Sequence, residues 1–188
     1  MINIALDGPA GSGKSTVAKK IANELNILYL DTGAMYRACA LKCLLSGVNV
    51  KDEKAVGNLM KNIDVRVEYK DGSQITLLDG KDVSKDIRLP EVSMLASDVS
   101  AHKTVREKMV ELQRRVAKSM DCVLDGRDIG SYVLPDAKFK YFITADSKVR
   151  AERRYKELIE RGTPVDFDKL HEEIKQRDYI KFSNRQWN

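Results

Sequence analysis

The sequence lacks several features that would place it in a specialised class of proteins. No run of about 18 apolar residues occurs in its 188 residues, which excludes a membrane-spanning helix of the usual length. It contains only three cysteines, Cys39, Cys43 and Cys122, and all three lie in apolar patterns. Because Cys39 and Cys43 are four residues apart on one predicted helix face, we interpret them as small core residues, not as metal ligands or disulfide partners.

Targeting and nucleic-acid signals are missing as well. The first residues lead directly into a predicted strand, so we expect no signal peptide and a cytoplasmic location. No basic stripe is interleaved with aromatic residues, and we therefore expect no nucleic-acid partner. A composition with 43% apolar and 32% charged residues suits one compact globular domain. The net charge of +5 favours an anionic partner.

A glycine-rich motif follows the first apolar run, residues 2–7. It reads G-x-x-x-x-G-K-S, and with the next residue it comprises Gly8, Pro9, Ala10, Gly11, Ser12, Gly13, Lys14, Ser15 and Thr16. A strand before the motif and a helical apolar pattern after it are the context that a phosphate-binding P-loop requires. Its glycines let consecutive N–H groups point at phosphate oxygens, and the following helix adds its positive dipole end. The motif predicts a nucleoside triphosphate site, with Lys14 at the β- and γ-phosphates and the Ser15 hydroxyl on Mg²⁺.

The next segments read as ordinary alternation of strand and helix. Residues 27–30 form a predicted buried strand that ends at Asp31, and Thr32 is placed to cap the following helix. Arg37, one turn into that helix, is placed to hold a second phosphate, although surface solvation is the commoner role of a lone arginine. Another helix is expected over residues 53–62.

The pattern then changes to alternating apolar and polar residues. Residues 65–69 and 75–78 are separated by a turn, and Asp79-Gly80 forms a second turn, which predicts a β-hairpin or a small antiparallel sheet. We expect residues 60–95 to be an inserted subdomain. Helices are expected near residues 91–100 and over a stripe formed by Val105, Met109, Leu112 and Val116.

A third strand of the main sheet is expected at residues 122–124. It ends in Asp125-Gly126-Arg127-Asp128, at a position where open α/β sheets form their ligand crevice, and Asp125 is placed to hold the water shell of Mg²⁺. A fourth strand is expected at residues 139–143, followed by an arginine-rich helix over 147–160 and a last helix near 166–178. Residues 150–165 read as a mobile lid over phosphates, or equally well as a charged helical hairpin.

Together these motifs resemble bacterial cytidylate kinases, the CMP/dCMP kinase branch of the nucleoside-monophosphate kinases. The segments that carry the resemblance are GPAGSGKST (8–16), DTGAMYR (31–37), DGKDVSKDIR (79–88), ASDVSAHKTVR (96–106) and DGRDIG (125–130). The P-loop is shared by many families, whereas DTGAMYR and DGRDIG in this order are far more specific. The resemblance extends from residue 2 to about residue 180. It implies a three-layer P-loop α/β fold with a central parallel sheet, which we expect to have four strands.

The resemblance also implies an activity and a set of site residues. The activity would be ATP-dependent phosphorylation of CMP and dCMP by a monomer, with Mg²⁺ as the cofactor and ATP as co-substrate. Ser97, Arg106 and Asp128 would read the cytosine. The full set that would bind CMP is Thr32, Arg37, Ser97, Arg106, Arg127, Asp128 and Arg177. Lys14, Arg127 and Arg154 would stabilise the transferred phosphoryl group, and Arg161 is a second lid candidate.

The C-terminal end departs from the family pattern, which reads approximately R-D-x-x-D-S-x-R. Lys181-Phe182 stands where one Asp would be, so Ser183 and Arg185 shift by one position, and about thirty residues of the family pattern have no counterpart. Without a final strand, residues 139–143 would form an exposed apolar sheet edge. Two alternatives stay open: a nucleotide-binding protein of the same fold with impaired or lost turnover, and a P-loop kinase with another small phosphate acceptor.

Overall fold

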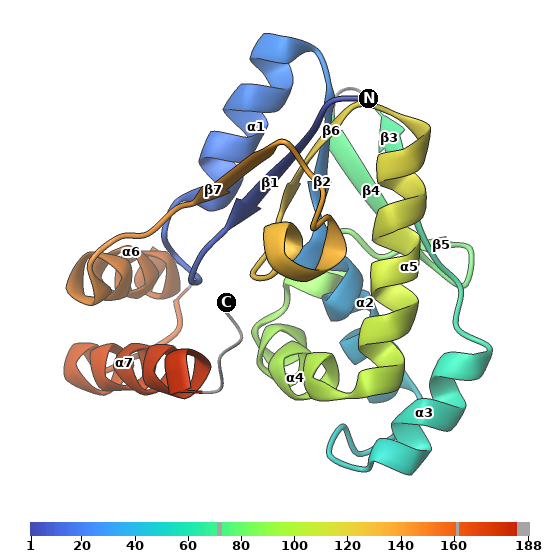
Figure 1. Ribbon diagram of the computed structural model, residues 1–188. Helices are drawn as coiled ribbons and strands as arrows, with labels where there is room; N and C mark the ends of the chain where they lie inside the picture. The colour runs from blue at the N-terminus through green and yellow to red at the C-terminus, as the bar shows by residue number, and fades with distance from the viewer. Residues whose placement is uncertain (71–72, 161, 184–188) are drawn as a thin grey trace. The chain divides into compact units, whose positions relative to one another are not determined.

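The computed structural model describes residues 1–70, 73–160 and 162–183, and for residues 177 and 180–183 it describes the backbone alone (Figure 1). By the contacts among its residues, the chain divides into two compact units. The first unit comprises Met1–Tyr29 and the chain from Asp121 onward, and the second comprises Leu30–Met120. The expected subdomain of residues 60–95 falls within the second unit, and its boundaries stay a prediction.

Strands and helices follow one another in the order expected from the sequence. In chain order they are β1 (Asn3–Asp7), α1 (Lys14–Leu25), β2 (Leu28–Asp31), α2 (Thr32–Leu45), α3 (Glu53–Lys61), β3 (Val65–Lys70), β4 (Ser73–Leu78), β5 (Lys81–Asp82), a 3₁₀ helix (Asp86–Arg88), α4 (Pro90–Ala101), α5 (Lys103–Ser119), β6 (Cys122–Asp125), a π-helical turn (Ile129–Val133), β7 (Phe139–Phe142), α6 (Ser147–Glu160) and α7 (Phe167–Ser183). Among these helices, none is long and apolar enough to cross a membrane.

The main sheet has four strands within the described residues, in the order β2-β6-β1-β7. β1 pairs in parallel with both of its neighbours, and Ala5 lies opposite Leu124 on one side and Lys140 on the other. The middle of β1 and all of β6 are buried, as is usual for central strands of a parallel sheet. Parallel pairing brings the carboxyl ends of β1 and β6 to the same edge of the sheet, which confirms the expected α/β architecture.

Helix α1 packs on this sheet through small side chains. Ala18 and Ala22 form a buried cluster with Ile4, Leu6 and Val123. The apolar pattern of this helix also includes Val17 and Leu25, but both of these side chains are exposed. Successive helical residues are about 100° apart, and the face that carries the two alanines turns toward the sheet and leaves Val17 outside.

The second unit contains an antiparallel sheet in the order β3-β4-β5. β4 and β5 are joined by Asp79-Gly80, whose φ angles of 49° and 82° are both positive. Two positive φ angles in a two-residue connection define the tight turn that matches the twist of a hairpin. The predicted small sheet and its second turn are therefore confirmed.

Helix α2 begins with a different cap from the one predicted. Oδ1 of Asp31 accepts a hydrogen bond of 2.9 Å from the N–H of Ala34, so Asp31 is the N-cap and Thr32 is the first helical residue. The prediction of a Thr32 cap was wrong by one position. The Asp31 carboxylate already accepts from the free N–H of Ala34, and Thr32 itself has become helical.

The buried face of α5 also differs from the predicted stripe. Val105 and Met109 are buried as expected, whereas Leu112 and Val116 are only half-buried. The positions that complete the buried face are Val110, Gln113 and Ala117. Since α5 contacts α2, α3 and α4, its buried face is broader than one narrow stripe.

The three cysteines are buried and free. Burial raises the pKa of the Cys39 and Cys122 thiols to about 12, far above the range in which a thiolate is available for metal binding. This agrees with their interpretation as small core residues.

Candidate active site

The phosphate loop connects β1 to α1 through glycines in unusual conformations. Gly8, Gly11 and Gly13 have φ angles of 145°, 76° and 97°. A Cβ atom at Gly8 would lie 2.0 Å from the carbonyl oxygen of Ile143, so this position admits only glycine. Gly13 precedes the first residue of α1 and offers no side-chain cap, which leaves the first N–H groups of the helix directed at the loop.

Two polar side chains of this loop are prepared for an anionic ligand. Nζ of Lys14 donates a hydrogen bond of 2.8 Å to the carbonyl oxygen of Pro9, which holds the lysine across the loop. Oγ of Ser12 is buried and has no hydrogen-bond partner among the described residues. A buried hydroxyl without a partner is costly, and a phosphate oxygen would satisfy it. The glycine cradle, Lys14 and Ser12 thus fit the phosphates of a nucleotide.

Asp125 lies at the carboxyl end of β6, beside the start of this loop. Its carboxylate is 4% exposed, and its Oδ2 accepts a hydrogen bond of 3.2 Å from the hydroxyl of Tyr29. In the register of the sheet, Asp125 lies opposite Leu6, and Leu6 is two residues before Gly8 of the phosphate loop. Oxygen ligands of this kind, with the exposed hydroxyl of Ser15 in the first turn of α1, fit a magnesium ion bound mainly through nucleotide phosphates.

The loop after β6 is anchored to the end of β1. The carboxylate of Asp7 accepts hydrogen bonds from the N–H groups of Ile129 and Gly130, at 2.7 Å and 2.8 Å. The backbone then forms a π-helical turn, in which the N–H of Val133, five residues on, donates to the carbonyl of Asp128 at 3.2 Å. π-Helical turns of this kind are frequent at functional sites. Arg127 and Asp128 lie immediately before this anchored segment.

Three arginines of α6 have three different environments. Arg150 is buried, donates from Nε to the carbonyl of Ala145 at 2.8 Å, and forms an ion pair with Asp178 of α7. Arg153 donates from Nη1 to the carbonyl oxygen of Gly11 in the phosphate loop at 3.2 Å. Arg154 is half-exposed and pairs with Glu157 at 2.8 Å.

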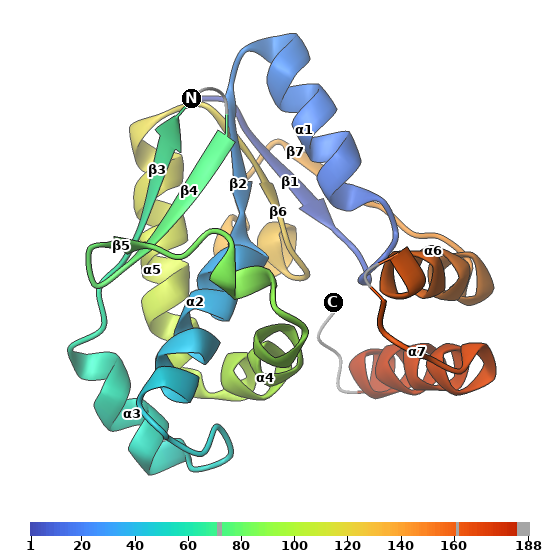
Figure 2. The same ribbon diagram turned by 180° about the vertical axis from the view of Figure 1, so that it is seen from behind.

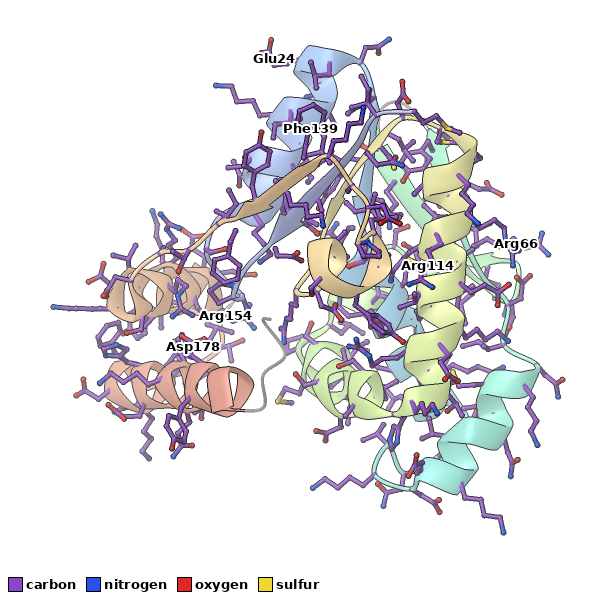
Figure 3. The ribbon with its side chains drawn as sticks, viewed as in Figure 1. Glu24, Arg66, Arg114, Phe139, Arg154 and Asp178 are labelled. Atoms are coloured by element: carbon purple, nitrogen blue, oxygen red, sulfur yellow. The ribbon has the colours of Figure 1, made fainter. Side chains whose placement is uncertain are left out.

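These contacts connect two helices and a loop of the first unit. Figures 1 and 2 show α6 and α7 lying side by side, and Figure 3 shows Asp178 on the side of α7 that faces α6. The side chain of Arg150 also lies against the phosphate loop, because a Cβ atom at Gly11 would be 3.4 Å from Cβ of Arg150. Arg150 therefore joins the loop to both helices.

In the second unit, Arg37 is held by an acid of its own helix terminus. Nη2 of Arg37 lies 2.9 Å from Oδ2 of Asp31, while its Nε is buried without a hydrogen-bond partner among the described residues. The ion pair fixes the guanidinium and leaves donor capacity for an anion, because an arginine carries five N–H donors.

Comparison with known proteins places these motifs in one family. The family model described as cytidylate kinase matches residues 4–187. A cytidylate kinase from Caldicellulosiruptor saccharolyticus is 52% identical over 177 residues, which cover 94% of this chain and 78% of that protein. Those from Lactobacillus johnsonii and Clostridioides difficile are each 48% identical and cover 99% and 98% of this chain, and 80% and 83% of their own lengths. The chain belongs to the cytidylate kinase family.

Membership of the cytidylate kinase family confirms the family expected from the sequence, the P-loop α/β fold and the class of enzyme, a nucleoside-monophosphate kinase. The similarity extends over nearly the whole chain. Neither alternative left open by the sequence, a protein without turnover or a kinase for another acceptor, is favoured by these relatives.

The candidate residues of this family member are distributed over both units. The first unit contains the phosphate loop, Asp125, Arg127, Asp128 and Arg154. The second contains the buried Thr32, Arg37 on α2, the exposed Ser97 on α4 and the half-buried Arg106 on α5. The side chain of Arg177 and all of Arg161 lie outside the described residues.

Sequence reasoning did not single out Asp7 and placed Arg150 and Arg153 only among the basic residues of the lid candidate. Asp7 ends the expected first strand, and its signal in the sequence is an ionisable residue directly before Gly8 at the carboxyl end of that strand. Arg150 and Arg153 belong to an arginine-rich segment in which composition does not separate a buried arginine from an exposed one. Because Arg150 and Arg153 are three residues apart, helical spacing places them on one face of the helix.

Proposed function

We propose that this chain transfers the γ-phosphoryl group of ATP to CMP and to dCMP, and releases ADP and the cytidine diphosphates. The observation that carries the proposal is the junction of the phosphate loop with the Asp125–Asp128 segment at one edge of the parallel sheet. Family membership at about 50% identity gives the acceptor class.

In this reaction an oxygen of the CMP phosphate attacks the γ-phosphorus, and the bond between that phosphorus and the oxygen bridging to the β-phosphate breaks. The attacking oxygen is already anionic, so no general base is needed. The chain's part is to align the two phosphates and to neutralise charge. Lys14 would act at the β- and γ-phosphates, and Arg127 and Arg154 would stabilise the transferred group, with Gly8 to Thr16 holding ATP.

CMP would be recognised by hydrogen bonds at its base edge and by arginines at its phosphate. We assign the cytosine to Ser97, Arg106 and Asp128, since a carboxylate accepts from the N4 amino group and an arginine donates to O2 and N3. Arg37, Arg127 and Arg177 would bind the phosphate and ribose side, with Thr32 beside them. The fixed guanidinium of Arg37 supports its part of this assignment.

Mg²⁺, bound with ATP, would supply charge neutralisation at the phosphate oxygens. The Ser15 hydroxyl would be its direct protein ligand, and Asp125 would hold it through water. The buried Asp125 carboxylate beside the phosphate loop supports this role. We also expect the enzyme to act as a monomer in the cytoplasm, with no nucleic-acid or membrane partner.

The test is a coupled ADP-release assay with ATP and Mg²⁺, in which CMP, dCMP, UMP and AMP are supplied in turn. We expect turnover with CMP and dCMP to exceed that with UMP and AMP. A preference for another acceptor would contradict the assignment of Ser97, Arg106 and Asp128. A folded chain that binds ATP and CMP without releasing ADP would contradict the proposed activity itself.

A further inference from the structure

We propose that Asp7 is a positioning residue, which fixes the loop of Arg127 and Asp128 to the start of the phosphate loop and thereby sets the affinity for CMP. This inference rests on the proposed function, because it names CMP as the substrate whose binding depends on Asp7. Asp7 itself touches neither substrate in this assignment.

The two oxygens of Asp7 are both used by the loop after β6. Oδ1 accepts from the N–H of Ile129 at 2.7 Å, and Oδ2 accepts from the N–H of Gly130 at 2.8 Å. Asp7 is the last residue of β1, and Gly8 of the phosphate loop follows it directly. One side chain therefore ties the strand end that begins the phosphate loop to the segment that begins one residue after Asp128.

The loop packs closely around this carboxylate. A Cβ atom at Gly130 would lie 3.3 Å from Oδ2 of Asp7 and 3.1 Å from Cδ of Lys140 on β7. The backbone of Gly130 is thus packed between two side chains. A displacement of the Asp7 carboxylate should therefore displace the loop as well. A carboxylate is the only side chain of this size that offers each of two neighbouring N–H groups an oxygen of its own.

The charges around Asp7 agree with this position. Burial raises the pKa of Asp7, and the nearby carboxylate of Asp128 raises it further, whereas the two N–H donors and Lys14 lower it. Asp7 thus lies within electrostatic reach of one residue assigned to CMP and one assigned to ATP. The two N–H donors offset part of the cost of burying the carboxylate.

CMP affinity should suffer more than ATP affinity when Asp7 is changed. The phosphate loop keeps hydrogen bonds of its own, from Nζ of Lys14 to Pro9 at 2.8 Å and from the N–H of Thr16 to Gly13 at 3.1 Å. The segment after Asp128 depends on Asp7 for the N–H groups of Ile129 and Gly130. The start of the loop keeps one anchor, from the N–H of Gly126 to the carbonyl of Leu6 at 3.0 Å. Loss of Asp7 should therefore displace the Asp128 end of the loop while the ATP side stays in place.

The test compares Asp7→Asn with the wild type by calorimetry, with CMP and a non-hydrolysable ATP analogue as separate ligands. Asparagine keeps the size but accepts with one atom only and points an NH₂ group at the other N–H. We expect the Kd for CMP to rise about 10- to 100-fold and the Kd for the ATP analogue to change less than about threefold. Steady-state assays should show the same split, as a rise in KM for CMP larger than that for ATP.

Asp121→Asn is the matched control. Oδ1 of Asp121 accepts from the N–H of Ile2 at 2.7 Å, a bond of the same kind at the opposite end of β1 and β6. We expect this variant to bind CMP like the wild type. An unchanged CMP affinity in Asp7→Asn, or equal losses for CMP and the ATP analogue, would overturn the proposal.

Two further measurements keep the outcome decisive. If Asp7→Asn does not fold, Asp7→Glu keeps the charge and both oxygens but moves them by one methylene, and it should again weaken CMP more than the ATP analogue. If the wild type binds no CMP, the proposed function fails. Amide hydrogen exchange then tests Asp7 separately, since faster exchange at Ile129 and Gly130 in Asp7→Asn supports the anchoring and unchanged exchange overturns it.

Discussion

At the residue scale, the ammonium group of Lys14 is held by a hydrogen bond at the end of a flexible side chain. Its Nζ is held by the carbonyl of Pro9, on the far side of the phosphate loop. We expect Lys14→Ala to lower kcat at least about 100-fold, as removal of one preorganised charge from a transition state does. The melting temperature should change by no more than a few degrees, because Lys14 is not part of the core.

Lys20→Ala is the matched control for Lys14→Ala. Lys20 lies on the same helix, is exposed and has no role in the proposed site. Its replacement should leave kcat unchanged. Near-normal turnover in Lys14→Ala would refute the assignment of the P-loop to ATP.

The ion pair between Lys42 and Asp79 gives a prediction on pH. Nζ of Lys42 lies 2.6 Å from Oδ2 of Asp79, and Lys42, followed by the N–H of Asp64, lowers the pKa of Asp79 below its ordinary value of 3.8. An acid whose pKa is lowered in the folded state contributes stability above its unfolded pKa. That contribution is lost as the pH falls through the folded pKa.

We therefore expect Lys42→Met to be less stable than the wild type at pH 7 by up to about 1 kcal/mol, since the pair is partly exposed. The difference should disappear at a pH well below 3.8, where Asp79 is protonated in both variants. Urea unfolding at the two pH values measures it. A difference that persists at the low pH would mean that Lys42 stabilises the fold by packing of its aliphatic stem.

At the scale of single elements, α6 carries a buried arginine and a half-exposed arginine to which we assign a catalytic role. Arg150 is 5% exposed and pairs with Asp178, whereas Arg154 is half-exposed and pairs with Glu157 (Figure 3). Arg150→Met should cost roughly 3 kcal/mol, the lower end for one partner of a buried pair, because Asp178 is partly exposed. For a chain of this length this lowers Tm by about 6–12 °C.

Arg154→Met provides the comparison within the same helix. Its surface pair contributes at most about 1 kcal/mol, so Tm should barely change. Its kcat should fall about 10- to 100-fold if Arg154 stabilises the transferred phosphoryl group. Normal turnover in Arg154→Met would point to Arg153, which contacts the phosphate loop at Gly11, as the arginine that acts there.

The elements themselves were predictable because local patterns determine them. The alternation in β3 and β4, the Asp79-Gly80 turn and the glycines of the phosphate loop each depend on residues close together in the sequence. The buried face of a helix was less predictable. Val17 and Ala18 are equally apolar in the pattern, and only the packing of α1 on β1 and β6 decides which of them is buried.

The contacts of Asp7 and Arg150 were beyond sequence reasoning for the same reason. Asp7 meets residues 122 and 123 positions away, and Arg150 meets a residue 28 positions away. No local period encodes such pairs. The candidate site was predicted where a motif supplies the residue, and missed where a residue acts by holding another segment in place.

At the scale of the whole molecule, the candidate residues lie in two units. The boundary between these units could not be predicted from the sequence pattern. The pattern changes near residue 65, where strands become antiparallel, but the second unit begins at Leu30. The reason is that α2 contacts α4, α5 and the strands of the small sheet, so that it belongs with them although it follows β2 of the main sheet. Long-range packing of this kind sets unit boundaries, and composition does not show it.

Strand β7 gives a prediction for the molecule in solution. It is the last strand of the main sheet within the described residues, and Phe139, Tyr141 and Phe142 on it are 44%, 53% and 49% exposed. A strand at the edge of a sheet that also carries exposed aromatic side chains is a template for association with another chain. Tyr141→Lys should therefore raise the protein concentration at which light scattering begins on mild heating, without lowering kcat.

Leu45→Lys is the control, because Leu45 is 70% exposed at the end of α2 and not on a sheet edge. If both variants shift the onset equally, the association depends on apolar surface in general, and the edge of β7 has no special part in it.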